Sequence, residues 1–567
     1  MKDTFQSNKK LQYFIFALST EFFMFIIAKA YFVSLSVHFA IGLTIVYFLY
    51  TIDILKKYKI ISLKYKLLGL VLGCILCFFL SGYCFETWRY STKISSLLQS
   101  VTTDPLIFLR KICYFLAILP LPFVSITINY LINTIKYFIR SISVKRIFHS
   151  VIQKLRFKCV VLYFGEIVVS SILGTFLLLG AYSIPIDNII ENVRKSAIIW
   201  RNESKIVFSW CSSQLDDWTD ALMLLEASQI SEKPIINQAL MAYRGEIINK
   251  NPNEVLPSHF IDEEDFTGTT DYPRYWHGNQ LYIKLLFLIM DYHQFRIFNG
   301  CVQFGLFFIS SFLLYKRRLA RYIIPWTIGY LMLMPVVLAK SLQYSPCYYI
   351  LMTGSILLLC IDKKHLKKVF TFCFLSFGIL TSYFDLLTLP PLTYSIPMLV
   401  YLLRQSSDSC ERKMSDLLSG GICWCLGYIG MWSMKWFIGT ILTDHNIFVD
   451  AANAIQMRTS MQSYDGLHNS PLDSVLMNIT TFLQTPFSFL LIVLFGYTIF
   501  KINQSGNFQI NDINQIPMLI VGSVPIFWYI LTVNHSTIHY WFTNKDCLSM
   551  VIASGFACID QIDKMER

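Results

Sequence analysis

Charged residues are scarce in this chain of 567 residues. Asp, Glu, Lys and Arg make up 15% of it, hydrophobic residues make up 54%, and the mean hydropathy is +0.50. A soluble globular domain carries about 25% charged residues, so the composition excludes that class. Apolar runs long enough to cross a hydrocarbon core of about 30 Å recur from end to end. The sequence therefore predicts an all-α polytopic membrane protein.

Three further absences narrow the class. The first apolar run, residues 11–28, lacks a small-residue cleavage site, so we interpret it as a retained span and not as a signal peptide. The 15 cysteines form no recognisable disulfide framework, and most lie within apolar runs, where cysteine acts as a small apolar residue. The sequence shows no internal repeat of the kind found in transporters built from two related halves.

Hydropathy predicts about fourteen spans, or twelve at the lower bound. They lie near 11–28, 33–52, 67–85, 112–132, 158–182, 296–315, 322–339, 345–361, 369–383, 391–403, 416–440, 484–500, 516–533 and 547–560. Basic residues concentrate on one side, in the loops at 56–66, 140–158, 316–321 and 363–368. By the positive-inside rule, these loops and both termini are expected to be cytoplasmic.

The chain is expected to have two parts. Residues 1–157 form a four-span unit that ends in a basic cytoplasmic linker, and residues 158–567 form a membrane core. The core contains one long loop, 183–295, on the predicted external side, and this loop holds more acidic than basic residues. Because loops of this length are usually functional, we expect it to be partly helical and to carry part of a site.

The stretch "LDDWTDALM" (215–223) places three carboxylates, Asp216, Asp217 and Asp220, in five positions. On a helix, positions 216 and 220 share a face. Two carboxylates one turn apart could hold a divalent cation such as Mg²⁺ or Mn²⁺, or one of the three could act as a general base. The alternative is an N-terminal helix cap with acidic side chains in the first turn.

A second cluster, "DYPRYWHG" (271–278), sets Arg274, Tyr275 and His277 among aromatic residues. An arginine can bind a phosphate bidentately, and a histidine beside it supplies a titratable donor. The alternative is an ordinary aromatic belt at the membrane interface.

A third cluster, "NHSTIHYWFTNK" (534–545), contains His535, His539 and Tyr540. The two histidines stand one helical turn apart, a spacing that could bind a metal, although no HExxH-type glutamate lies between them. Hydrogen bonding to a phosphate or sugar is an equal possibility, and a plain interfacial turn is the alternative.

Two single residues join these clusters. Asp385 stands at the predicted external mouth of a span, just before the proline pair of "LLTLPP". Lys435 lies between two tryptophans nominally within a span, where it would either snorkel outward or neutralise an acid or phosphate. Ionisable residues at membrane depth are candidates for a functional site.

All these clusters fall on or near the predicted external side. ATP and nucleotide sugars are absent outside a plasma membrane, so transfer reactions there use lipid-linked donors. Such a reaction needs a carboxylate to deprotonate the acceptor hydroxyl and cationic or hydrogen-bonding groups for the leaving phosphate. The clusters supply both kinds of group.

In this layout the chain resembles the GT-C superfamily of integral-membrane glycosyltransferases. The stretches "LDDWTDALM", "YPRYWHG", "SYFDLLTLPP", "MWSMKWF" and "NHSTIHYWF" also look like an uncharacterised family of large membrane proteins of low-GC Gram-positive bacteria. That second likeness covers roughly residue 157 to the C-terminus. The acidic cluster departs from the GT-C pattern because it lies well beyond the preceding span, which leaves open which aspartate is the base.

The GT-C resemblance implies an inverting transfer in a bacterial cell membrane, from a polyprenyl-phosphate-linked sugar to a cell-envelope glycan. An aspartate of 216–220 would activate the acceptor, Arg274 and His277 would bind the donor phosphate, and the histidine pair would complete the pocket. Other classes stay open: a flippase, exporter or polymerase of lipid-linked polysaccharide, or a non-catalytic scaffold for envelope enzymes. A flippase would show charges along its spans, and here these are few: Glu21, Glu166 and Lys435.

Overall fold

A computed structural model describes most of the chain beyond residue 142. The described residues are 143–208, 211–462, 469–483 and 515–566, with isolated positions at 71, 485, 487, 490, 491 and 494. Apart from these isolated positions, five predicted spans lie outside the described residues: 11–28, 33–52, 67–85, 112–132 and 484–500. Nearly all of the predicted four-span unit of residues 1–157 lies outside them as well.

The described residues are almost entirely helical, which confirms the predicted fold class at this level. The first half contains α7 (Val144–Lys154), α8 (Phe157–Tyr182), α9 (Asp187–Asn202), η2 (Cys211–Ser213), α10 (Asp217–Ala227), α11 (Ile235–Met241), β1 (Arg244–Glu246), α12 (Pro252–Phe260), β2 (Gly268–Thr270), α13 (Asn279–Phe287) and α14 (Tyr292–Lys316). The second half contains η3 (Ala320–Tyr322), α15 (Ile323–Met332), α16 (Pro335–Ala339), α17 (Ser345–Cys360), α18 (Lys363–Phe384), α19 (Pro390–Arg404), α20 (Cys410–Leu442), α21 (Ile447–Thr459), α22 (Pro471–Leu483), α24 (Ile516–Gly522), α25 (Val524–Leu531), α26 (Val533–Ile538), α27 (Tyr540–Thr543), η5 (Asn544–Cys547) and α28 (Leu548–Glu566).

Three helices in the described part of the chain are long and apolar enough to cross a membrane: α8, α14 and α20, with 26, 25 and 33 residues. All three match predicted spans. Much of their surface is exposed and apolar, as on α8, where Phe164 and Phe176 are each about two-thirds exposed. Exposed phenylalanines on an apolar helix are expected where the surrounding solvent is lipid. Two shorter apolar stretches, Ser345–Cys360 and Ile516–Leu531, accompany them.

Two predicted spans are not single helices. The segment 322–339 is divided between α15 and α16 because Met334 adopts a left-handed backbone conformation (φ 58°) and Pro335 follows it. A proline at the first position of a helix is favourable, whereas one in the interior breaks it. The segment 516–533 is likewise divided at Ser523, just before Pro525.

Helices α18 and α20 pack with their backbones in direct contact, and two glycines make this contact possible. A Cβ atom on Gly378 would lie 2.1 Å from the carbonyl oxygen of Trp424, and one on Gly427 would lie 2.2 Å from that of Leu375. Small residues allow such close approach, which is a common way for helices to associate in lipid.

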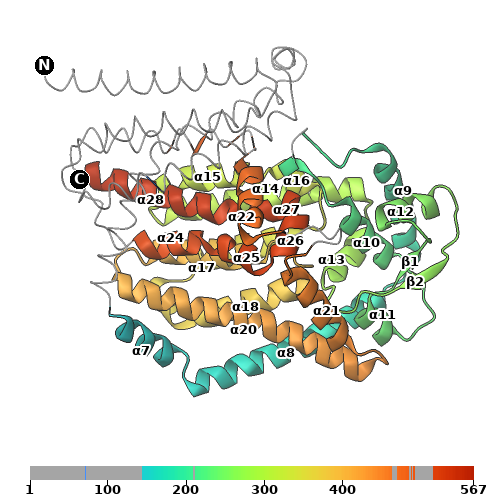
Figure 1. Cartoon of the computed structure of the whole chain (residues 1–567), viewed down its shortest axis with the longest axis horizontal. Helices are drawn as coiled ribbons and strands as arrows, with labels where there is room; N and C mark the ends of the chain where they lie inside the picture. Colours follow the sequence, from blue (N-terminus) through green and yellow to red (C-terminus); the bar gives the residue numbers. More distant parts are fainter. Residues whose placement is uncertain are drawn as a thin grey trace, which may run out of the picture. The chain divides into compact units, whose positions relative to one another are not determined.

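Helices α9 to α13 and the antiparallel pair β1–β2 gather at one end of α8, α18 and α20 (Figure 1). We call this end the loop end. The long loop is therefore partly helical, as predicted. Its apolar core includes Ile189 and Val193 from α9, Leu224 from α10 and Ile283 from α13, all fully buried. Each such side chain contributes about 1.5–3 kcal/mol by leaving water, so the loop end is a folded layer.

Candidate functional site

The first carboxylate of the acidic cluster, Asp216, caps helix α10. Its Oδ1 accepts a hydrogen bond from the Thr219 backbone N–H at 3.1 Å, and its Oδ2 accepts one from the Thr219 hydroxyl at 2.8 Å. Burial raises the pKa of Asp216, and the hydrogen bonds from Thr219 partly offset that effect. The helix-cap interpretation is therefore confirmed for this residue.

The third carboxylate, Asp220, holds the turn that precedes α17. It is fully buried and accepts hydrogen bonds from the backbone N–H groups of Leu342 at 2.9 Å and Gln343 at 2.8 Å. The Tyr292 hydroxyl donates to it as well. Burial raises the pKa of Asp220 to about 7 despite these donors. The Asp220 side chain thus connects α10 to the turn that precedes α17 by hydrogen bonds.

Asp217 differs from both neighbours. It is half-buried in the first turn of α10, and among the described residues its carboxylate has no hydrogen-bond or ion-pair partner. Burial, and then the nearby Asp216 carboxylate, raise the pKa of Asp217 to about 6, while Arg296 acts in the opposite direction. A carboxylate that is accessible, unpaired and titrates near neutrality is suited to accept a proton.

The cluster does not fit a divalent cation held by Asp216 and Asp220. The oxygens of both carboxylates already accept hydrogen bonds from their own chain. No group of three or more His, Cys, Asp or Glu side chains within the described ranges could hold a metal ion.

The cation Arg296, whose charge acts on Asp217, belongs to an ion-pair network. Glu203 pairs with both Arg296 and Lys340, and Arg296 also donates through Nε to the Lys340 carbonyl oxygen at 3.0 Å. Burial alone would raise the pKa of Glu203, but its hydrogen bonds to Lys340 and Arg296 together outweigh that effect. The pKa is therefore lowered, and the carboxylate stays ionised. Sequence reasoning missed Arg296 and Glu203, because no local pattern links residues that lie 93 positions apart.

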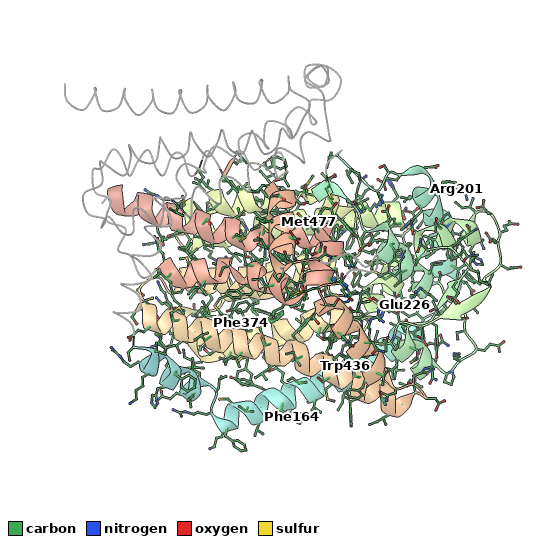
Figure 2. The ribbon with its side chains drawn as sticks, viewed as in Figure 1. Phe164, Arg201, Glu226, Phe374, Trp436 and Met477 are labelled. Carbon is green, nitrogen blue, oxygen red and sulfur yellow. The ribbon has the colours of Figure 1, made fainter. Side chains whose placement is uncertain are left out.

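The C-terminal end of α10 contains a buried ion-pair cluster, which we define as Glu226, His277 and Tyr182. His277 Nδ1 lies 2.8 Å from Glu226 Oε2, and the Tyr182 hydroxyl donates to Glu226 Oε1 at 2.7 Å. His277 Nε2 donates to the Tyr272 carbonyl oxygen at 2.9 Å. Figure 2 labels Glu226 inside the loop end.

His277 was predicted to bind the donor phosphate, and this arrangement leaves it no free nitrogen. Its side chain is fully buried, its backbone is left-handed (φ 55°), and Gly278 follows in close contact with Tyr383. A Cβ on Gly278 would lie 2.4 Å from the Tyr383 ring, so glycine is required there. The "WHG" sequence is explained by packing.

Lys435 does not snorkel. It is fully buried in α20, and its Nζ donates to the carbonyl oxygen of Leu240 at 2.6 Å and lies 5.7 Å from the centre of the Trp276 ring. Its hydrogen bond fastens the end of α11 to the long helix.

Arg274 keeps one donor free. Its Nη1 pairs with Asp450 at 3.1 Å and its guanidinium lies 4.3 Å from the centre of the Tyr272 ring, but its buried Nε has no acceptor in the described part of the chain. The neighbouring Tyr275 is almost fully buried, and burial raises its pKa. Arg274 therefore has one buried N–H that no acceptor in the described part of the chain satisfies.

The two histidines of the third cluster are distinct. His535 Nε2 donates to the Leu387 carbonyl oxygen at 3.0 Å, and the guanidinium of Arg458 contacts Nδ1, which fixes a neutral tautomer. His539 stacks on Phe542 with ring centres 5.1 Å apart, and its Nδ1 has no partner among the described side chains. Burial and Arg458 lower the pKa of His539 to about 3, so the ring is neutral at pH 7. Tyr540 begins the next helix, α27.

Asp385 lies in a second group of buried acceptors. Its Oδ2 accepts from the Thr388 backbone N–H at 2.8 Å, whereas its Oδ1 has no nitrogen or oxygen donor in the described ranges. Asp546 is fully buried, and neither of its oxygens has a partner there. Burial and then the Asp385 carboxylate raise the pKa of Asp546. Sequence reasoning missed Asp546, which immediately follows the third cluster.

Tyr344 joins the acidic helix start to the histidines. Its hydroxyl donates to the Gln214 carbonyl oxygen at 2.8 Å, and its ring centre lies 6.2 Å from that of Phe542. The Lys545 Nζ lies over the Tyr344 ring at 4.8 Å and donates to the Ser212 carbonyl oxygen at 3.1 Å. Segments far apart in the sequence thus meet at the loop end.

Comparison with known proteins gives no assignment. No family model, no curated protein and no solved structure matches this chain.

Proposed function

We propose that the protein is an integral-membrane glycosyltransferase of GT-C type. In this proposal the loop end faces the exterior of a bacterial cell membrane, and the chain transfers a sugar from a polyprenyl-phosphate donor to a hydroxyl of a cell-envelope glycan. The observation that carries the proposal is the carboxylate of Asp217. It is half-buried, unpaired among the described residues and titrates near pH 6, while its two acidic neighbours are fully used by the fold.

Asp217 is the general base in this proposal. Its carboxylate takes the proton of the acceptor hydroxyl as that oxygen bonds to the anomeric carbon of the donor sugar. The bond between the anomeric carbon and the phosphate oxygen breaks, and polyprenyl phosphate leaves with the electron pair. A single displacement of this kind inverts the anomeric configuration.

The leaving phosphate needs donors that the fold has not already used. Arg274 offers Nε, and His539, neutral at pH 7, offers a ring nitrogen. Their segments are linked, because Arg274 pairs with Asp450 on α21, and Arg458 of the same helix contacts His535. In this proposal Arg274 and His539 bind the phosphate, and Asp217 acts on the acceptor hydroxyl.

The test compares strains that lack the protein and are complemented with the wild type, with Asp217→Asn, or with Asp262→Asn. Asp262 is an exposed acid of the same loop end that pairs with Arg201, so its variant is the matched control. Polyprenyl-phosphate sugars and surface glycan are measured by mass spectrometry.

We expect Asp217→Asn to accumulate the lipid-linked sugar and lose a glycan residue, as the deletion does, at normal protein levels. Asp262→Asn should restore both. Full restoration by Asp217→Asn would contradict the proposal.

A further inference from the structure

Helix α7 has three faces along its length. At about 100° per residue, Ile147 and Val151 fall on one side and are buried. Val144, Phe148 and Ile152 follow one another at four-residue spacing on the next side, and they are 76%, 66% and 53% exposed. The remaining side carries exposed polar residues: Lys145, Arg146, His149 and Gln153.

The buried face of α7 packs on the start of α20. Lys154 bonds Asp416 at 2.5 Å and the Ser415 hydroxyl at 2.8 Å, and Arg146 pairs with Glu411 at 3.4 Å. These contacts fix the rotation of α7 about its axis. The exposed apolar row is therefore held in one direction.

Exposed apolar residues resume at the start of α8, three residues after the end of α7. Phe157, the first residue of α8, is 82% exposed, and Val161 and Phe164 extend the apolar surface along a helix that is long enough to cross a membrane. A helix with protein on one side, apolar residues on the second and polar residues on the third fits the boundary between lipid and water.

We propose that α7 lies in the membrane interface, with Val144, Phe148 and Ile152 inserted among the lipids of an anionic leaflet. This inference rests on the proposed membrane placement of α8, and it does not depend on the transfer reaction. Charge complementarity selects the lipid, because Lys145, Arg156 and Lys158 are exposed beside the row and would meet negative headgroups. The row would set the depth at which α8 and α20 enter the bilayer.

Photo-crosslinking of the full-length protein in vesicles of neutral and anionic phospholipid tests the proposal. Benzoylphenylalanine is placed at position 148 or 152, at positions 145 and 153 as matched controls on the polar face, and at position 164 on α8. We expect lipid adducts at 148 and 152 to exceed those at 145 and 153 about tenfold, as expected for an apolar row inserted among lipids.

Anionic lipid should be enriched about fivefold in these adducts, and Lys145→Ala with Arg156→Ala should remove that enrichment. Adducts at 164 without adducts at 148 and 152 would overturn the proposal, as would protein adducts at 148. A lack of lipid adducts at 164 would overturn the membrane placement itself. None of these outcomes depends on whether Asp217 is a base.

Discussion

The two ends of helix α10 hold acidic residues in opposite circumstances. At its start, Asp217 is half-buried and unpaired within the described residues. At its other end, Glu226 is fully buried and bonded to Tyr182 and His277. A buried acid with hydrogen-bond partners stabilises the fold, whereas a partly exposed acid without partners is available to react. In α10, therefore, the acid whose hydrogen bonds remain unsatisfied is the better candidate for a functional residue.

The largest effect should come from Asp217→Asn. If Asp217 is the base, transfer by purified protein should fall about 10²–10⁴-fold, because the amide cannot take a proton. The thermal unfolding temperature in detergent should not fall at pH 7, since the carboxylate bonds to nothing in the described part of the chain and the neutral amide removes the cost of burying its charge. An unaltered transfer rate would show that Asp217 is not the base.

At the other end, Glu226→Ala should act on stability. Removing this carboxylate leaves His277 and the Tyr182 hydroxyl buried without their partner, which costs about 3–5 kcal/mol of unfolding free energy. The measurement is thermal unfolding in detergent, with Glu226→Gln as the control that keeps both hydrogen bonds. Equal stability of the Ala variant and the wild type would show that the cluster is not structural.

Asp220 lies between these extremes, and Asp220→Asn should destabilise the protein by a smaller amount. An asparagine can accept one of the two backbone hydrogen bonds, and the other buried N–H loses its acceptor at a cost of about 1–3 kcal/mol. Unfolding temperature and transfer rate are measured on the same sample. A lost rate with full stability would move the catalytic role from Asp217 to Asp220.

The pH dependence of the transfer rate tests Asp217 directly. A base must be deprotonated, and the pKa of Asp217 is raised to about 6, so activity should rise as pH increases through 6 and level off above 7. At pH 5 only about a tenth of the carboxylate is ionised, which predicts a rate about tenfold below the plateau. A profile that is flat from pH 5 to 8, with the protein stable throughout, would exclude Asp217 as the base.

The smallest effect is expected from Asp262→Asn. This acid is exposed and pairs only with Arg201 among the described residues. Exposed ion pairs contribute little to stability. Neither the unfolding temperature nor the transfer rate should change measurably. A large loss of either would show that an exposed acid of the loop end can also be essential, so that exposure does not distinguish functional acids from dispensable ones.

Hydropathy was sufficient to predict the helical class and the positions of α8, α14 and α20, because long apolar runs leave few other structures in lipid. The count of about fourteen spans and the membrane topology stay predictions. Hydropathy could not show the breaks at Met334 and Ser523, since backbone conformation there depends on neighbouring segments.

The three clusters did contain residues of the candidate site, but the sequence could not divide the roles among them. Whether His277 faces a ligand or Glu226 depends on a residue 51 positions away. The backbone N–H groups that bond to Asp220, in the 342–343 turn, come from a distant segment. So does Arg296, whose charge acts on Asp217 without pairing with it. Composition and spacing identify polar groups, and only the fold shows which of them remain unpaired.

The close backbone contacts at Gly378 and Gly427 have a mechanical consequence. Because no side chain separates the two backbones at these positions, we expect α18 and α20 to resist bending there. If a lipid-linked donor must enter and its carrier must leave, this helix pair would not bend to admit either. Motion would then concentrate at the helix breaks at Met334 and Ser523, which would act as hinges.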